Sequence, residues 1–239
     1  MKRRLKSMVK GILKFIPIRF SRNQRYDAQT LEIMRRVLKP GSVCVDVGAH
    51  EGEILREMIK CAPGGKYFCF EPIPNLYEKV KRTFPEAKVF DCALSDHKGS
   101  ASFQYVVSNP AYSGLKRREY KGKEEIKEIE VKTELLDDLL PLSEKIHLIK
   151  IDVEGGELGV LRGAEKLIRK WKPVVIFEHG KGASEFYGTG PDHIFSFFQE
   201  AGMKISILNS YLKNAEALTG EEFKRQFEQG INYYFIAHP

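Results

Sequence analysis

Hydrophobic and polar positions alternate along the chain in blocks whose periods predict strands and helices in turn. Short apolar runs bounded by Gly, Pro or charged residues are typical of buried strands. Segments with apolar positions three and four residues apart are typical of helices that cover a sheet. The apolar runs predict seven strands, over residues 43–47, 66–70, 88–92, 146–151, 174–177, 204–208 and 233–237.

Helical periods fill most of the gaps between these strands. They predict helices over residues 27–38, 52–61, 75–83, 157–170 and 192–201. Repeated strand–helix units with right-handed crossovers give a parallel sheet with helices on both faces. We therefore expect an α/β protein with a doubly wound, mostly parallel seven-stranded sheet.

The middle of the chain interrupts this rhythm. Residues 101–107 and 129–133 alternate like two paired strands, so we expect a β-hairpin insertion. The stretch between them, residues 108–127, is polar and highly charged. A loop of this length within a compact domain is usually functional or disordered. It is either a lid over an acceptor or a solvated excursion on the surface.

The N-terminal segment carries an amphipathic pattern. Leu5, Val9, Ile12 and Ile16 are spaced by four, three and four residues, which is one face of a helix over residues 2–16. Basic residues fill much of the other side, so the helix either binds an anionic membrane surface or docks on its own domain with its lysines solvated. We therefore divide the chain into a basic helical extension, 1–40, and a ligand-binding domain, 41–239.

Charge and cysteine usage exclude several classes of protein. The net charge is +7, but residues 1–25 hold nine Lys or Arg and no acid, which leaves −2 for residues 26–239. A slightly acidic body argues against a nucleic-acid groove. The four cysteines form no C-x-x-C pair, so a zinc site is not expected and the compartment is reducing. We expect a cytoplasmic protein that binds peripherally at the inner face of a membrane.

Two motifs at strand ends indicate an adenosine cofactor. Asp46, Gly48 and Gly52 lie where the first strand passes into a glycine-bearing turn, and Glu71 ends the second strand. A doubly wound sheet holds such a cofactor with a glycine turn after strand one and an acid after strand two. Gly48 lets the backbone approach the ligand, and Glu71 accepts both ribose hydroxyls. The alternative is that Asp46 and Glu71 each cap the helix that follows.

Further polar residues follow strands three, four and five, at the sheet edge where ligands bind in open α/β sheets. With the turn motifs they resemble the FkbM-type methyltransferases over residues 42 to about 180. Each motif alone is weak, but their order and spacing are specific. The matching stretches are Asp46–Gly52, Glu71–Pro74, Ala93–Asp96, Lys150–Gly155 with Glu157, and Val160–Ala164.

This resemblance implies a class I, Rossmann-like methyltransferase fold with S-adenosyl-L-methionine as cofactor. It also implies methyl transfer to oxygen, often to a hydroxyl of a sugar or natural-product acceptor. The family usually has Asn where this chain has His50, and Ala where it has Gly156. The expected cofactor-binding residues are Asp46, Gly48, His50, Gly52, Glu71, Pro72, Ala93, Ser95 and Asp152.

Candidate catalytic groups follow strands four and five. The sulfonium already activates the methyl group, so the enzyme must align the acceptor oxygen and help it lose its proton. Asp152 is expected to be catalytic or to orient the acceptor. Glu178 and His179 end the neighbouring strand, and His179 suits a general base because its ordinary pKa lies near neutrality. A less favoured alternative is that Asp152, Glu178 and His179 bind a divalent metal, which the resemblance does not imply.

The leading hypothesis is an S-adenosylmethionine-dependent O-methyltransferase that acts on a glycan, lipid-linked or natural-product acceptor. A nicotinamide-dependent oxidoreductase is the first alternative, but its G-x-G-x-x-G turn is absent because His50 stands at the second glycine position. A non-catalytic membrane-associated binding module is the second alternative, and intact Asp46, Glu71 and Asp152 argue against it. The acidic body argues against a nucleic-acid substrate.

Overall fold

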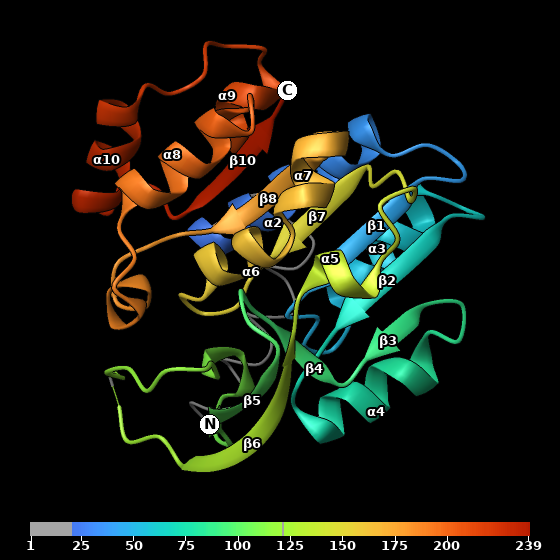
Figure 1. Ribbon diagram of the computed structural model, residues 1–239. Coiled ribbons are helices and arrows are strands. Elements are labelled where there is room, and N and C mark those ends of the chain that lie inside the picture. Colours follow the sequence, from blue (N-terminus) through green and yellow to red (C-terminus); the bar gives the residue numbers. More distant parts are fainter. Residues whose placement is uncertain (1–20, 121) are drawn as a thin grey trace, which may run out of the picture.

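A computed structural model describes residues 21–120 and 122–239, which form two sheets of very different size (Figure 1). The central sheet has seven strands in the order β3-β2-β1-β7-β8-β10-β9, which confirms the predicted doubly wound sheet. The expected helix over residues 2–16 lies outside the described residues. The strands of the central sheet are β1 (Val43–Val47), β2 (Lys66–Phe70), β3 (Lys88–Phe90), β7 (Leu148–Ile151), β8 (Val174–Glu178), β9 (Lys204–Ile207) and β10 (Tyr234–His238).

The strand directions bring the candidate residues to one edge of this sheet. The strands from β3 across to β8 run parallel, whereas β10 is antiparallel to both β8 and β9. Because the carboxyl ends of parallel strands meet at a common edge, the residues that follow β1, β2, β7 and β8 converge there. The sheet is therefore mostly parallel with an antiparallel margin, as the sequence predicts.

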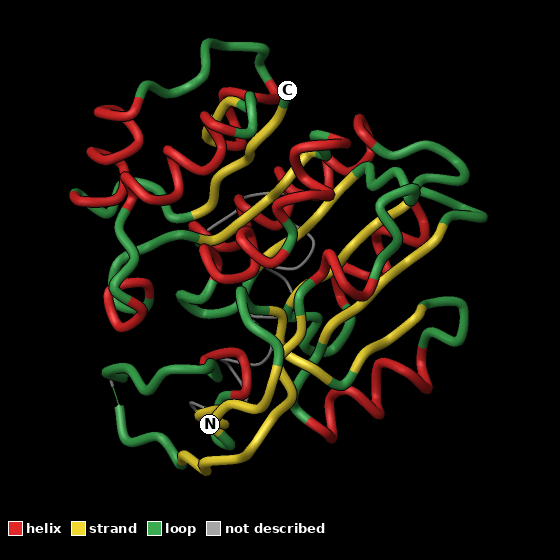
Figure 2. Tube along the Cα trace, in the orientation of Figure 1, coloured by secondary structure: helices red, strands yellow, loops and turns green. Residues whose placement is uncertain are grey.

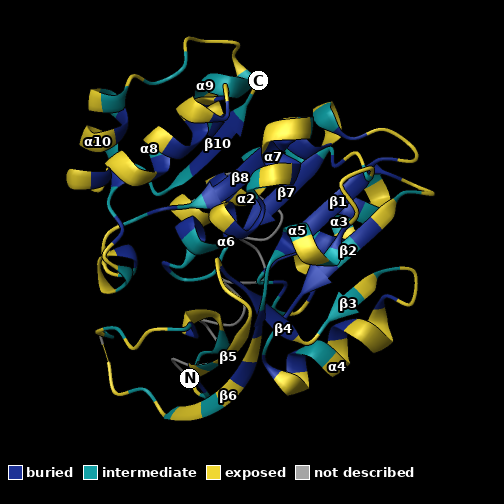
Figure 3. Cartoon of the chain, in the orientation of Figure 1, coloured by how far each residue is buried: buried dark blue, intermediate teal, exposed yellow. Residues whose placement is uncertain are grey.

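Helices cover both faces of the central sheet, and alternate strand positions supply two cores (Figures 1 and 3). Cys44, Leu148 and Ile176 pack towards one face, whereas the adjacent Val45 and Ile149 pack towards the other. This division follows from the two-residue period of a strand. The first face is covered by α2 (Arg22–Val37), α3 (Glu53–Cys61) and α9 (Leu208–Leu212), and the second by α5 (Leu136–Leu139), α6 (Glu157–Gly163), α7 (Glu165–Trp171), α8 (Pro191–Glu200) and α10 (Gly220–Glu228).

Helix α2 packs against the core on the first face of the sheet, which contains Cys44, Leu148 and Ile176, although the helix precedes the sheet in sequence. Ser21 forms a capping box with Gln24 at its start, and Ile33 and Met34 are fully buried. The division of the chain at residue 40 stays a prediction. Among the described residues, no helix combines the length and the apolar character required to cross a bilayer.

The insertion supplies two strands of the smaller, three-stranded sheet, whose order is β4-β6-β5, and Figure 2 shows the long loop that joins them. Strands β5 (Gly99–Val106) and β6 (Ile126–Glu134) pair antiparallel, with Phe103 opposite Ile129, which confirms the predicted hairpin. The single strand predicted over residues 88–92 is wrong, because the chain leaves the central sheet at Asp91. The next three residues form β4 (Cys92–Leu94), which pairs with β6 instead.

The single helix predicted over residues 157–170 is also wrong, because it breaks at Ala164 into α6 and α7. Gly163 packs so closely on the carbonyl of Ser95 that a Cβ there would overlap it. The carboxylate of Asp137 then accepts hydrogen bonds from the amides of Lys166 (2.8 Å) and Leu167 (3.0 Å). This distant residue caps α7 as an N-cap side chain would.

Candidate active site

The turn after β1 passes very close to the end of β7. Gly48 has φ +77°, and its amide donates to the carbonyl of Phe70 at 3.0 Å. A Cβ at Gly48 would overlap the carbonyl oxygen of Asp152, so no other residue fits without a shift of backbone. Gly52, at the start of α3, likewise packs on the ring of Phe84. Both glycines therefore set the path of the turn itself.

Glu71 follows β2 and is fastened to the same turn. Its two carboxylate oxygens accept hydrogen bonds from the amides of His50 (2.8 Å) and Ile73 (2.9 Å). Burial raises the pKa of Glu71 to about 7, although both backbone donors act to lower it. Each oxygen keeps a second acceptor position, so the carboxylate suits a pair of ribose hydroxyls.

A first cavity lies at this sheet edge and collects most of the expected cofactor residues. Val47, Phe70 and Ile73 give it apolar walls suited to an adenine ring. Pro110 and Leu115 of the insertion also line it, and its free volume is about 70 Å³. Ligand pockets usually hold roughly 300–1,000 Å³, so the free space of this cavity is small for a cofactor. The expected residues gathered here are Gly48, His50, Glu71, Pro72, Ala93 and Asp152.

Three expected cofactor residues lie outside the first cavity. Asp46 is buried next to Lys150 on β7, its neighbour in the strand register, and burial raises the pKa of Asp46 to about 6. Its carboxylate has no hydrogen-bond partner among the described residues. Ser95 lines an adjoining cavity, where its hydroxyl lies 3.3 Å from a carboxylate oxygen of Asp96. Gly52 packs on Phe84 as described above.

Asp152 is the most firmly held acid of the site. Its Oδ2 accepts hydrogen bonds from the ammonium of Lys150 at 2.7 Å and from the hydroxyl of Tyr234 on β10. Burial alone would raise the pKa of Asp152, but Lys150, Glu178 and Tyr234 together lower it to about 2. Lys150 is itself buried, yet Asp152 and Asp46 hold its pKa above the ordinary value. Asp152 and Lys150 therefore form a buried ion pair.

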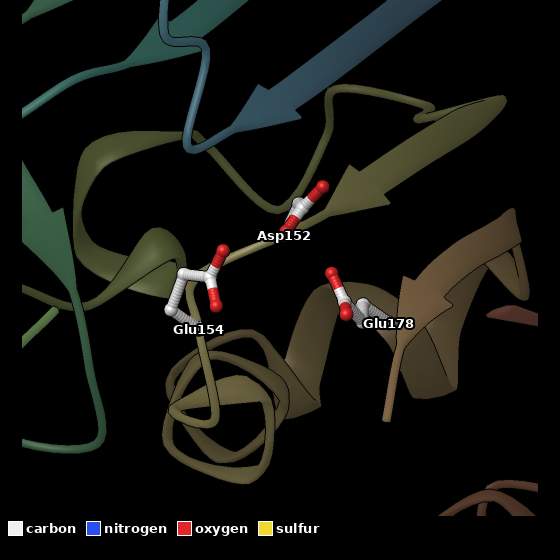
Figure 4. A group of neighbouring side chains, drawn as sticks. All are labelled: Asp152, Glu154 and Glu178. Carbon is white, nitrogen blue, oxygen red and sulfur yellow. The ribbon is translucent and has the colours of Figure 1, made fainter. Parts of the chain in front are cut away.

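Asp152, Glu154 and Glu178 form a cluster of three carboxyl groups, the acid triad (Figure 4). One oxygen from each lies within 4.8 Å of the others. Burial, and then the charges of Asp152 and Glu154, raise the pKa of Glu178 well above its ordinary value. Burial raises the pKa of Glu154 to about 8, although Arg118 contacts it at 2.5 Å. Carboxylate oxygens are also ligands for hard divalent cations, so the triad is a candidate donor set.

His179 is not part of this triad. Successive side chains of a strand point to opposite faces, so His179 points away from Glu178. Its ring stacks against Phe227 and Phe223, with centroids 4.8 and 6.0 Å away. Both ring nitrogens lack a hydrogen-bond partner within the described part of the chain, and burial lowers the pKa of His179 to about 4. The geometry thus places a neutral imidazole in an apolar core.

A second, larger cavity of about 740 Å³ adjoins the first. The insertion contributes Asn109, Tyr112 and Arg118 to its wall, and Glu178 closes the opposite side. The short 3₁₀ helix η1 (Pro110–Tyr112) separates the two cavities, because Pro110 lines the first and Tyr112 the second. Glu154 lines both cavities, so the acid triad lies at their junction.

Four residues of the site were not expected to have a functional role: Lys150, Glu154, Tyr234 and Arg118. Lys150 carries a signal that could have been used, because a lysine within an apolar strand requires a buried partner. Tyr234 reaches Asp152 only because β10 pairs antiparallel with β8, where it lies opposite Glu178. Arg118 has no local signal, since it is one of many charges in the insertion.

Comparison with known proteins identifies the chain's relatives. A family model described as the methyltransferase FkbM domain matches residues 46–205. The 2-O-methyltransferase NoeI of Sinorhizobium fredii is 27% identical over 171 residues, which are 63% of this chain and 70% of that protein. The hexuronic acid methyltransferase AglP of Haloferax volcanii is 24% identical over 192 residues, which are 78% of this chain and 73% of that protein.

A solved structure with the same description supports the fold. The methyltransferase FkbM from Methylobacillus flagellatus aligns with a TM-score of 0.51 at 16% identity, over 87% of this chain and 50% of that one. The family match decides against a nicotinamide-dependent oxidoreductase and against a non-catalytic module. The chain therefore belongs to the FkbM methyltransferase family and is an enzyme that uses S-adenosylmethionine.

Proposed function

We propose that the enzyme transfers a methyl group to a hydroxyl of a glycan, lipid-linked or natural-product acceptor. The position of the acid triad carries this proposal. Asp152 lines the first cavity, Glu178 lines the second, and Glu154 lines both. A hydroxyl that enters the junction from the second cavity therefore meets carboxyl groups next to the proposed cofactor cavity.

The residues of the first cavity suit the cofactor. In the proposed complex Glu71 binds the ribose hydroxyls, and the apolar wall near Ala93 covers the adenine. The cofactor supplies the methyl group on a sulfonium, which needs no further activation. What remains for the protein is to position the acceptor oxygen and to take its proton.

The triad can do both. Asp152 is ionised at neutral pH and accepts a hydrogen bond from the acceptor hydroxyl, while Lys150 and Tyr234 hold it in place. The pair of Asp152 and Glu178 takes the proton in its fully ionised form, as the oxygen–methyl bond forms. The base role expected for His179 stays a prediction, and its burial between phenylalanine rings gives that role no support. The divalent metal expected at Asp152, Glu178 and His179 likewise stays an untested alternative, for which the triad with Glu154 in place of His179 is the candidate donor set.

The names of two relatives support an oxygen acceptor on a sugar. NoeI is named as a 2-O-methyltransferase and AglP as a hexuronic acid methyltransferase. These names describe those proteins. They agree with the carboxyl-lined second cavity of this chain, because hydroxyl groups donate hydrogen bonds and carboxylates accept them.

The test is methyl transfer by the full chain with S-adenosylmethionine and a pool of hydroxyl-bearing glycosides and natural-product alcohols. We expect an O-methylated product by mass spectrometry and NMR. Asp152→Asn and Glu178→Gln should each lower the rate by about 10²–10⁴-fold, the usual contribution of acid–base catalysis. Glu86→Gln, an exposed acid outside both cavities, is the matched control. Methylation of nitrogen or carbon, or full activity in both triad variants, would contradict the proposal.

We also propose that residues 2–16 bind an anionic membrane surface on the cytoplasmic side, a proposal supported by the amphipathic pattern of the sequence alone. The full chain should sediment with anionic vesicles, and a chain that lacks residues 2–16 should stay in the supernatant. Equal pelleting with neutral and anionic vesicles would contradict this part.

A further inference from the structure

The wall of the second cavity is rich in acidic residues. Its described lining contains two cationic side chains, Arg118 and Lys181. Arg118 balances one acid of the lining, since its guanidinium pairs with Glu154 at 2.5 Å and lies over the rings of Tyr112 and Tyr120 at 5.0 and 5.7 Å. Its Nε has no partner among the described residues. The acidic residues of the same lining are Glu119, Glu124, Glu154, Glu157 and Glu178.

These acids differ in how they are held. Glu157 is buried and accepts the amide of Gly155 at 3.0 Å, so it fixes the loop after β7. Glu124 accepts a hydrogen bond from the hydroxyl of Ser108. Glu178 and Glu154 belong to the triad, and burial raises the pKa of both. A second negative charge placed beside them would make their ionisation harder still.

Charge therefore separates classes of acceptor at this cavity. A hydroxyl or an ammonium group donates hydrogen bonds, which carboxylates accept. A carboxylate, sulfate or phosphate ester only accepts. Its negative charge would oppose the charges of Glu119 and Glu124, and it would also oppose the ionisation of Glu154 and Glu178. Tyr112, which is 44% exposed, adds an aromatic surface of the kind that packs on the apolar face of a sugar ring.

We propose that the second cavity selects an uncharged or amino-bearing sugar or polyol and rejects acceptors that carry a carboxylate, sulfate or phosphate near the methylated hydroxyl. This inference rests on the proposed function. It separates this chain from AglP, whose name gives a hexuronic acid as its substrate. Like-charge exclusion of this kind is a common device for specificity.

The experiment measures three matched glycosides on the full chain saturated with S-adenosylhomocysteine. Methyl glucosaminide and methyl glucuronide each differ from methyl glucoside at one carbon, through an amino group and a carboxylate respectively. Ligand-observed NMR gives the affinities of all three. We expect the glucuronide to bind at least about tenfold more weakly than the glucoside, which corresponds to one unit of log Kd. The glucosaminide should bind as well as the glucoside or better.

A charge reversal identifies the cause. Glu119 is exposed on the insertion loop and lines the cavity, so Glu119→Lys leaves the core intact. This variant should lower the ratio of the Kd of the glucuronide to the Kd of the glucoside by several fold. Glu86→Lys is the same charge reversal on an exposed residue outside the cavity and should leave this ratio of Kd values unchanged.

The possible outcomes distinguish a failure of the charge selection from a failure of the proposed function. Failure to bind S-adenosylhomocysteine in a prior calorimetric titration would overturn the proposed function. Cofactor binding with equal or tighter binding of the glucuronide would overturn only the charge selection. Cofactor binding with no binding of any of the three glycosides would also overturn it, because a sugar or polyol would then not be the class selected.

Discussion

Asp152 and Glu178 end neighbouring parallel strands, but only Asp152 contacts the ammonium of Lys150, at 2.7 Å. The two carboxyl groups therefore behave oppositely. The pKa of Asp152 falls to about 2, whereas burial and the charge of Asp152 raise the pKa of Glu178 well above its ordinary value. The pair therefore becomes fully ionised only at a higher pH than two ordinary carboxyl groups would, and it is the better base in that form.

The rate of methyl transfer should consequently rise with pH. A carboxyl with a raised pKa loses its proton only as the pH increases through that value, so the basic form of the pair gains population over a higher pH range than an ordinary carboxyl requires. We expect kcat/KM to climb through this range and Glu178→Gln to remove the rise. A pH–rate profile of both proteins is the measurement. An identical profile in the variant would show that the rise comes from another group, of which Glu154, with a pKa of about 8, is the first to examine by Glu154→Gln.

Replacement of Glu71 should weaken the cofactor and leave the acceptor cavity intact. Hydrogen bonds to a charged group contribute about 1.5–3 kcal/mol each, so Glu71→Ala should weaken S-adenosylhomocysteine binding by at least about tenfold. Calorimetric titration measures this loss. Because Glu71 also holds the amides of His50 and Ile73, Glu71→Gln serves as a milder variant that keeps one acceptor oxygen. Unchanged affinity in a folded Glu71→Ala protein would exclude a ribose contact.

Two glycines with similar backbone angles should respond very differently to alanine. Gly48 and Gly64 have φ +77° and +70°, but only at Gly48 would a Cβ meet the backbone, whereas Gly64 has open space. The left-handed conformation alone costs a non-glycine residue roughly 1–2 kcal/mol. We expect Gly64→Ala to lower the free energy of unfolding by about 1 kcal/mol and Gly48→Ala by at least about 3 kcal/mol. Urea unfolding of both variants compares them, and equal losses would contradict the close approach of the turn to Asp152.

His179 should make the fold sensitive to acid. Its pKa falls from 6.5 to about 4 on folding because burial disfavours the charged ring. The unfolded chain therefore binds a proton that the folded chain does not, and stability is lost as the pH drops from about 6.5 towards 4. His179→Phe, which suits a site between two phenylalanine rings, should gain about 3 kcal/mol relative to the wild type between pH 7 and pH 4. A difference between the two proteins that stays constant with pH would contradict this.

The sequence predicts the central sheet well because its strands are locally encoded. Apolar runs such as Val43–Val47 and Leu148–Ile151 fill buried positions on both faces of the sheet, and their ends carry the polar residues of the site. The predicted bounds of strands and helices are wrong where contacts between residues distant in sequence determine them. Asp91 ends β3 because β6 offers the next residues another pairing partner, and α7 begins where it does because Asp137 caps it.

The same reasoning explains which parts of the site were found. Glu71 follows a strand and is placed by local rules. His179 also follows a strand, but successive side chains of a strand point to opposite faces. The side chains of Glu178 and His179 are therefore separated. Arg118 reaches Glu154 only through the fold of the insertion. Long-range contacts of this kind leave no trace in a single sequence.

The helix η1 imposes a sequence of events on turnover. It supplies residues to the wall of each cavity, so any shift of the insertion on cofactor binding would also reshape the place where the acceptor is proposed to bind. We therefore expect addition in a compulsory order, with S-adenosylmethionine binding first and S-adenosylhomocysteine leaving last.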